Sequence, residues 1–332
     1  MGRNLSGALK PLFICHEISY DGGMLKDLPQ EDPKPALALV AAGWSVTTVA
    51  VLLVIKTYAY VESGSAAILA TLMDSVIDAG VSVILFLAIR LSLKPADTVH
   101  RHGHGKVEGL AALFQAAMMF GGAAFLVFEA AHRFIHPDVV EHHVLSGSIA
   151  ALAIVLSVIL ISVQRYVLKR APSLALEADR AHYTTDIALN GSVIAALAID
   201  YYGGPHWVDP AVALCIAGYF AWTSWGIGMQ GTDMLMDREM PDAVRKRIID
   251  IVNRHDEALG IHDLRTRKSG MVLHISFDVE IDPHMTLSQA HDVTRELENM
   301  ILADFPYAEV LIHMDPHGDT YDARHSVKGV HH

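Results

Sequence analysis

Charged residues are scarce in this sequence: Asp, Glu, Lys and Arg make up 19% of its 332 residues, whereas hydrophobic residues make up 52%. Soluble domains carry about 25% charged residues, so this pairing argues against a soluble globular protein and against a disordered one. It favours an integral membrane protein. Positive charge is the scarcer sign, with 25 Lys and Arg against 37 Asp and Glu. Because nucleic-acid binding needs a basic surface, we expect no nucleic-acid partner.

Cysteine is nearly absent as well. The two cysteines, Cys15 and Cys215, leave no disulfide framework and no cysteine-rich zinc site. Histidine is abundant by contrast, with 20 residues. The positions of these histidines are therefore the most informative feature of the sequence.

Six segments are long and apolar enough to cross a bilayer, which takes about 20 residues. Four of them contain no charged residue: residues 36–55, 109–128, 144–164 and 210–232. The other two contain ionisable groups at membrane depth: residues 63–89, with Asp74 and Asp78, and residues 181–199, with His182 and Asp186. We therefore predict a membrane α-helical protein with six transmembrane helices.

The loops between these segments predict the orientation of the chain. The loop after the second segment and the loop after the fourth are rich in Lys and Arg, whereas the first loop, near residues 61–64, and the last, at 200–209, carry none and the loop after the third segment carries only Arg133. Basic loops stay in the cytoplasm, so we expect both termini on that side of a plasma membrane, the bacterial inner membrane.

The soluble parts of the chain lie before and after the helices. We predict a cytoplasmic arm over residues 1–35, the transmembrane domain over 36–236, a cytoplasmic domain over 237–316 and a disordered tail over 317–332. Residues 237–332 hold 11 Lys and Arg against 18 Asp and Glu, a net charge of −7. Hydrophobic periodicity predicts a helix at 241–259, strands at 261–267 and 271–281, a helix at 286–305 and a strand at 308–314. This α-β-β-α-β order suggests a small open sheet with helices on one face.

The charged groups inside the membrane segments form two pairs with the same spacing. Asp74 and Asp78 are four residues apart, as are His182 and Asp186. That spacing places both members of a pair on one helix face, so two helices together offer three carboxylates and one imidazole. Four such ligands complete a tetrahedral metal site. The alternative is that the carboxylates pair with basic residues, but Lys56 alone cannot neutralise three of them.

A second candidate metal site lies in the loop after the second segment. Asp97, His100 and His104 have the spacing of a compact site, with His102 as a spare candidate. Gly103 and Gly105 allow the tight backbone that such a site requires. The alternative is a solvated basic loop that only sets the topology.

A third candidate site lies in the cytoplasmic domain. His313 and Asp315 are two residues apart on the last strand and face the same side of it. Strand ends and the second helix could converge there and make a site of imidazoles and carboxylates. The candidate ligands are His262, Asp278, His291, His313 and Asp315.

Several motifs together carry a family resemblance. They are the two membrane pairs, the loop sequence His-Gly-His-Gly-Lys-Val-Glu from residue 102, His-Asp-Leu-Arg-Thr-Arg from residue 262 and His-Met-Asp-Pro from residue 313. On these motifs the chain resembles the cation diffusion facilitator family over about residues 36–316, and within it the bacterial zinc/proton antiporters of the ferrous-iron efflux type.

The resemblance implies a homodimer of six-helix protomers with metallochaperone-like cytoplasmic domains. It implies a transport site at Asp74, Asp78, His182 and Asp186, a second site at Asp97, His100 and His104, and a binuclear site at His262, His313 and Asp315. His291 would contribute to the last site at the dimer contact, and Asp278 replaces a histidine of the relatives. The resemblance further suggests a salt bridge between Lys106 and Asp237 that locks the dimer.

Metal and protons compete for ligands of this kind, because the ligands must be deprotonated to bind a cation. An inward proton gradient can therefore drive metal outward by alternating access, with the direction supplied by the resemblance. We expect Zn²⁺ as cargo and as regulatory ion, with Cd²⁺, Fe²⁺, Mn²⁺ or Co²⁺ as alternatives. A metal sensor anchored in the lipid bilayer and a channel are further alternatives. An enzyme is not expected, because no His-Glu-x-x-His motif is present.

Overall fold

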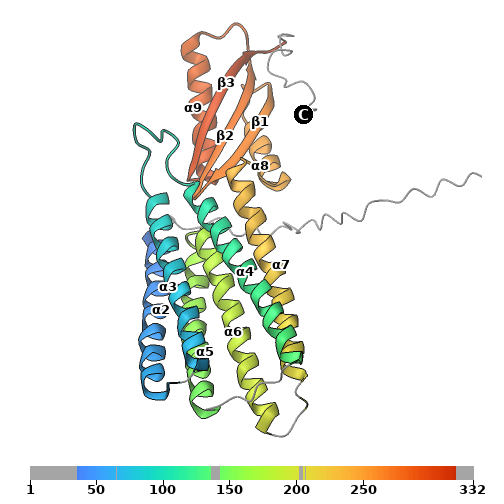
Figure 1. Cartoon of the computed structure of the whole chain (residues 1–332). Helices are drawn as coiled ribbons and strands as arrows, with labels where there is room; N and C mark the ends of the chain where they lie inside the picture. Colours follow the sequence, from blue (N-terminus) through green and yellow to red (C-terminus); the bar gives the residue numbers. More distant parts are fainter. Residues whose placement is uncertain (1–35, 65, 136–142, 202–204, 206, 319–332) are drawn as a thin grey trace, which may run out of the picture.

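The computed structural model describes residues 36–64, 66–135, 143–201, 205 and 207–318. The predicted arm over residues 1–35 lies outside the described residues, as does the predicted tail beyond residue 318. Within the described ranges, a long helical bundle carries a small domain with a β-sheet at one end (Figure 1). The predicted fold class, a helical transmembrane region followed by a small cytoplasmic α/β domain, is confirmed.

The bundle contains six long helices in the described ranges: α2 (Ala36–Ser63), α3 (Ala66–Ser92), α4 (Val107–Ile135), α5 (His143–Leu168), α6 (Leu174–Tyr201) and α7 (Val208–Leu235). All of these except α6 contain a segment long and apolar enough to cross a membrane. Helix α6 is more polar because Glu177, Asp179 and Arg180 lie in its first turns. It contacts each of the other five helices, so protein rather than lipid surrounds much of its surface.

One buried carboxylate fixes the start of α6. Glu108, in the first turn of α4, is 1% exposed. Its Oε2 accepts hydrogen bonds from Ser173 Oγ at 2.8 Å and from the Leu174 backbone N–H at 3.0 Å. Its Oε1 accepts a hydrogen bond from Ser92 Oγ at 3.0 Å. A carboxylate there accepts a hydrogen bond from one of the free N–H groups at the start of α6 and complements the helix dipole. The contact thus links α3, α4 and α6.

The cytoplasmic domain has the predicted order of elements: α8 (Asp242–Val252), β1 (Gly260–Ser269), β2 (Val272–Ile281), α9 (Leu287–Asp304) and β3 (Ala308–Pro316). Strand β2 lies between the other two strands, antiparallel to β1 and parallel to β3. The predicted capping box of α9 is present, since Thr286 and Gln289 bond to each other's backbone N–H groups. Helix α8 ends at Val252 rather than at residue 259. Val252 is also the last of its buried residues, the residues that hold the helix against the sheet.

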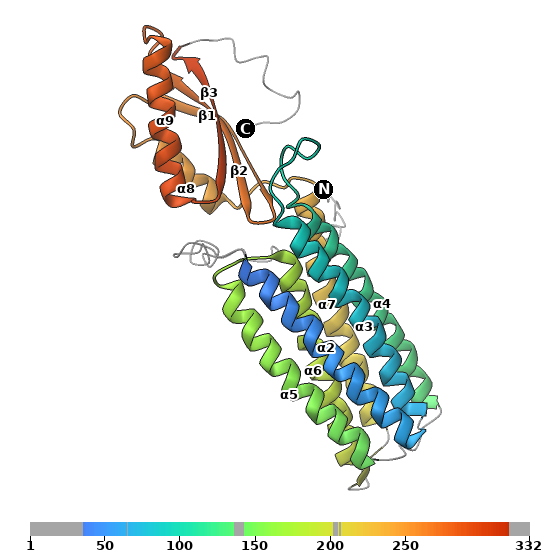
Figure 2. The same cartoon turned by 90° about the vertical axis from the view of Figure 1, so that its left-hand side faces the viewer.

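Both helices of this domain cover the same face of the sheet (Figure 2). The buried residues Ile275, Phe277 and Val279 alternate along β2 and form the core with α8 and α9. Because successive residues of a strand point to opposite faces, the residues that alternate with these three, among them His274 and Asp278, lie on the other face. Polar residues of that open face form the third of the candidate centres described below.

Candidate metal centres

The first candidate centre lies inside the helical bundle, where α3 meets α6. His182 Nε2 lies 3.2 Å from Asp78 Oδ1 and 3.4 Å from Asp186 Oδ2. One possible ligand atom of each of these three residues lies within 4.8 Å of the others. Both ring nitrogens of His182 are buried and have no hydrogen-bond partner. A buried imidazole that makes no hydrogen bond and lies between two carboxylates is the arrangement that a divalent cation would complete.

Asp74, the predicted fourth ligand, is not part of this group of three. It lies one turn before Asp78 on α3, and its residue is exposed in the single chain. Nearby, the Lys56 ammonium donates hydrogen bonds to the Thr71 carbonyl at 3.0 Å and to Ser75 Oγ at 2.7 Å. The fourth ligand therefore stays a prediction.

A further carboxylate in the bundle was missed by the sequence reasoning. Asp179 is 2% exposed and lies one turn before His182 on α6. Its Oδ2 accepts hydrogen bonds from Ser45 Oγ of α2 at 2.5 Å and from Gln164 Nε2 of α5 at 2.8 Å. The spacing of Asp179, His182 and Asp186, three and then four residues, is that of one helix face. That spacing could have revealed Asp179, but the predicted membrane segment began only at residue 181.

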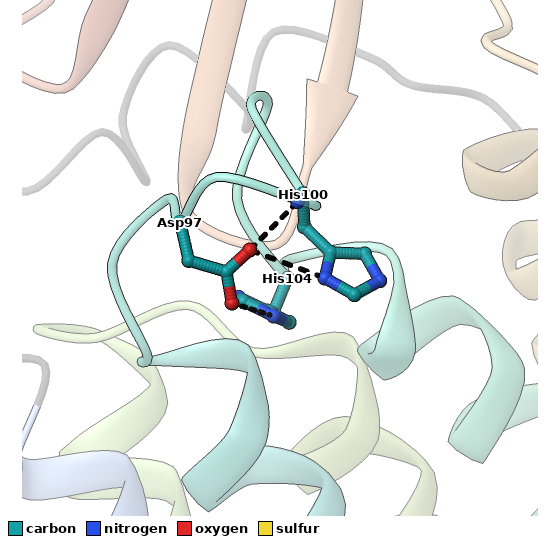
Figure 3. Close-up of side chains that lie close together, drawn as sticks. All are labelled: Asp97, His100 and His104. Atoms are coloured by element: carbon teal, nitrogen blue, oxygen red, sulfur yellow. Dashed lines mark hydrogen bonds and ion pairs between the residues drawn. The ribbon is translucent and has the colours of Figure 1, made fainter.

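The second candidate centre is the loop between α3 and α4 (Figure 3). Asp97 accepts hydrogen bonds from the His100 backbone N–H at 2.7 Å and from Lys94 Nζ at 3.1 Å. These hydrogen bonds hold the pKa of Asp97 well below its ordinary value, so the carboxylate is ionised at neutral pH. His100 Nδ1 lies 3.4 Å from Asp97 Oδ1, and His104 Nε2 lies 3.5 Å from Asp97 Oδ2. The loop thus gathers all three of its predicted ligands.

The third candidate centre lies on the open face of the sheet. His262 and Asp278 are register partners on β1 and β2, and Asp278 and His313 are register partners on β2 and β3. His262 Nε2 lies 3.3 Å from Asp315 Oδ2 and His262 Nδ1 lies 3.8 Å from Asp278 Oδ2. Burial raises the pKa of Asp278, although the charges of His313 and His262 oppose this shift.

Two predicted ligands lie at the margin of this third group. His313 Nε2 is 3.1 Å from Asp315 Oδ1, but His313 is not one of the group of three formed by His262, Asp278 and Asp315. His291 is on α9, which covers the opposite face of the sheet. A single chain has no dimer contact, so the predicted binding role of His291 at that contact stays a prediction.

The predicted salt bridge between Lys106 and Asp237 joins the membrane part to the cytoplasmic domain. Lys106 Nζ lies 2.9 Å from Asp237 Oδ2, and Arg267 Nη1 lies 3.3 Å from Asp237 Oδ1. Partial burial raises the pKa of Asp237, but Lys106 and then Arg267 outweigh it, so the pKa lies below its ordinary value. The pair therefore holds the end of α7 against the start of α4.

His102, the spare candidate of the loop, belongs to a different group. It lies with His274 and Glu309, two residues of the sheet that the sequence analysis left unassigned. Burial, and next the charge of Arg267, hold the pKa of His274 below its ordinary value. The ring is therefore neutral at neutral pH.

Comparison with known proteins places this arrangement among metal transporters. Residues 44–236 match the family profile "Cation efflux transmembrane domain", and residues 240–317 match "Cation efflux protein, cytoplasmic domain". The cation-efflux pump FieF of Shewanella oneidensis is 40% identical over 277 residues, which cover 83% of this chain and 93% of that protein. FieF of Yersinia pestis (strain Pestoides F) is 37% identical over 296 residues, which cover 89% of this chain and 98% of that protein.

Among solved structures, the metal-bound C-terminal domain of the CzcD transporter from Thermotoga maritima is similar to part of the chain. It is 26% identical, and the match covers 24% of this chain and 92% of that domain, with a TM-score of 0.23.

Proposed function

The chain belongs to the cation efflux family, the cation diffusion facilitators, and on this premise we propose that it exports Zn²⁺ from the cytoplasm in exchange for protons. Membership makes it a multi-pass membrane protein that moves divalent metal cations outward. Family membership does not specify the metal or the counter-ion, and we propose Zn²⁺ as the cargo and protons as the counter-ion.

One observation supports the proposal above all others: Asp78, His182 and Asp186 come together from two helices within the bundle. Ionisable groups at membrane depth face a polar pathway or one another, because lipid does not solvate them. Nitrogen and oxygen donors without cysteine suit Zn²⁺, and they also accept Cd²⁺, Fe²⁺, Mn²⁺ and Co²⁺. Asp74 would complete the tetrahedral set by turning toward the group.

Proton exchange follows from the chemistry of these ligands. Two carboxylates and a neutral imidazole bind a cation only when they are deprotonated. Once the cation leaves, ionised groups close together in a low dielectric take up protons. Metal and protons then occupy the same residues in turn, and an inward proton gradient favours the outward movement of metal.

The cytoplasmic domain would regulate this cycle as part of a homodimer. With a net charge of −7 from residue 237 onward, two such domains repel each other. Cations bound at His262, Asp278 and Asp315 would offset the repulsion, and His291 and His313 would add ligands at the contact. With both termini in the cytoplasm of the bacterial inner membrane, these sites would respond to the cytoplasmic metal concentration.

The test is Zn²⁺ flux into proteoliposomes with and without a pH gradient. Asp78→Asn and Asp186→Asn should reduce the flux by at least about 10–100-fold, the loss typical even of outer-sphere partners of a metal. Glu129→Gln is the matched control, because Glu129 pairs with Arg133 on the surface of α4 at 2.8 Å. Retained flux in either Asp variant would refute the site assignment.

Two further comparisons separate the finer parts of the proposal. Flux that ignores the pH gradient would refute proton exchange and favour a channel. Faster flux of Cd²⁺, Fe²⁺, Mn²⁺ or Co²⁺ than of Zn²⁺ would refute zinc as the preferred cargo. Asp74→Asn should also slow the flux if Asp74 joins the other three ligands during transport.

A further inference from the structure

Three residues from three separate segments meet where the α3–α4 loop reaches the cytoplasmic domain. They are His102 in the loop, His274 on β2 and Glu309 on β3. His274 and Glu309 are register partners on the parallel strands, so both lie on the open face of the sheet. One possible ligand atom of each residue lies within 4.8 Å of the others. Figure 2 shows the α3–α4 loop close to the strands of the sheet.

His274 is the central residue of the group. It is 9% exposed, and its Nδ1 lies 2.9 Å from Glu309 Oε2. Its Nε2 is buried and has no hydrogen-bond partner. Buried polar atoms without a partner are rare in folded proteins, and such an atom indicates a bound water, a bound ion or a functional role. The ring of His102 stands nearly perpendicular to that of His274, with the two ring centroids 6.0 Å apart.

The charges around the group are compatible with a bound cation. Arg267 is the register partner of His274 on β1, and its guanidinium lies 3.3 Å from Asp237 Oδ1. Glu309 is exposed and contributes one negative charge to the group. Two imidazoles and one carboxylate are the donors of open zinc sites, in which water fills the fourth position.

We propose that His102, His274 and Glu309 bind a divalent transition-metal ion of the Zn²⁺ class and so join the α3–α4 loop to the sheet. This site is separate from the three centres described above, because it shares no residue with them. One ligand comes from the loop that follows α3, and α3 is the helix that carries Asp78. The other two ligands come from the cytoplasmic domain. Metal binding and loop docking are therefore thermodynamically linked, so each strengthens the other.

The test counts the Zn²⁺ ions bound by the purified full-length protein in detergent, by equilibrium dialysis. The test variants are His102→Ala and Glu309→Gln, which alter exposed residues of two different segments. The controls are His255→Ala and Glu296→Gln, which alter a His–Glu pair of the same domain similar to the pair of His274 and Glu309. His255 Nε2 lies 3.1 Å from Glu296 Oε2, and their side chains are 9% and 69% exposed, against 10% and 60% for His274 and Glu309.

We expect each test variant to lose one Zn²⁺ per chain, or to bind that ion at least about tenfold more weakly, whereas both controls bind as many ions as the parent. The double variant His102→Ala/Glu309→Gln should lose no more than either single variant, because one ion is shared. Unchanged binding in either test variant would overturn the proposal. So would additive losses in the double variant, since these would mean two separate ions.

Hydrogen exchange supplies a second measurement. Zn²⁺ should slow the exchange of backbone amides in residues 98–104 of the parent and of the controls, but not in His102→Ala. Slowing of the same size in His102→Ala would contradict the link between the ion and the loop. Both measurements record binding alone, so their outcome is independent of whether the protein exports zinc.

Discussion

Two glycines, Gly105 of the α3–α4 loop and Gly270 of the turn between β1 and β2, lie against each other where the loop meets the cytoplasmic domain. A Cβ atom added to Gly105 would overlap the Ser269 carbonyl, lying 2.6 Å from its carbon, and would lie 2.8 Å from Ser269 Oγ. A Cβ atom on Gly270 would lie 3.0 Å from Gly105 Cα. The loop therefore meets the turn between β1 and β2 backbone against backbone. We predict that Gly105→Ala separates the two.

The magnitude follows from what the added methyl group would meet. Overpacking a well-packed contact costs about 1–3 kcal/mol. The obstructing atoms here belong to backbone, which cannot rotate away as a flexible side chain can, so we expect the upper end of that range. About 3 kcal/mol shifts the equilibrium between docked and undocked loop by roughly 100-fold.

Gly103→Ala is the matched control two residues earlier. Gly103 has a φ of +76°, and an added Cβ would have no atom within 4 Å. Alanine there costs about 1–2 kcal/mol for the left-handed backbone, without obstructing the turn. Both substitutions strain the loop, but only Gly105→Ala disrupts its contact with Ser269.

The assay is hydrogen exchange of the full-length protein, followed at residues 268–271. Gly105→Ala should accelerate exchange in this turn by roughly 100-fold, whereas Gly103→Ala should leave it near the parent rate. Equal rates in the parent and in Gly105→Ala would show that the contact does not hold the loop. Equal acceleration in both variants would show that loop strain, not contact, is responsible.

Three further predictions concern the stability of the cytoplasmic domain. Phe277 is 1% exposed, so Phe277→Ala leaves a cavity in the core and should lower the free energy of unfolding by about 3–5 kcal/mol in chemical denaturation. A loss below about 1 kcal/mol would contradict the placement of Phe277 in the core. Thr286→Ala removes the capping box of α9 and should cost about 1 kcal/mol in the same assay, and an unchanged stability would contradict it. Lys106 lowers the pKa of Asp237 against the effect of burial. The ionised Asp237 therefore adds to the free energy of unfolding above the unfolded pKa of about 3.9, and this stabilisation is lost as the pH falls through the lower folded pKa. Thermal denaturation between about pH 5 and pH 3 should therefore show a shallower acid decline for Asp237→Asn than for the parent, and parallel curves would refute the salt bridge.

Local sequence patterns determined the elements of the fold, because each pattern acts within one element. Apolar runs located the membrane helices, and alternation located β2 within one residue of its observed start. The capping box of α9 needs only Thr286 and Gln289, which are three residues apart. The ligands of the loop centre could be predicted for the same reason, since Asp97, His100 and His104 lie within one stretch of eight residues.

Local patterns were less informative where a residue's role depends on what covers it. Helix α6 is polar for a membrane helix, but it contacts all five other helices of the bundle, and its Asp179 accepts hydrogen bonds from residues of α2 and α5. Gly103 and Gly105 look alike in the sequence, yet one adopts a positive φ and the other makes a close contact with a distant turn.

The sequence by itself determined which residues share a helix face or a strand face, and so it identified the pairs Asp74/Asp78 and His182/Asp186. Only the tertiary structure decided which faces meet: it brought Asp78 to His182 and Asp186, left Asp74 outside that group, and turned His102 toward His274 and Glu309. Residue spacing fixes direction within one rigid element, whereas contacts between elements depend on how all side chains of the chain pack together.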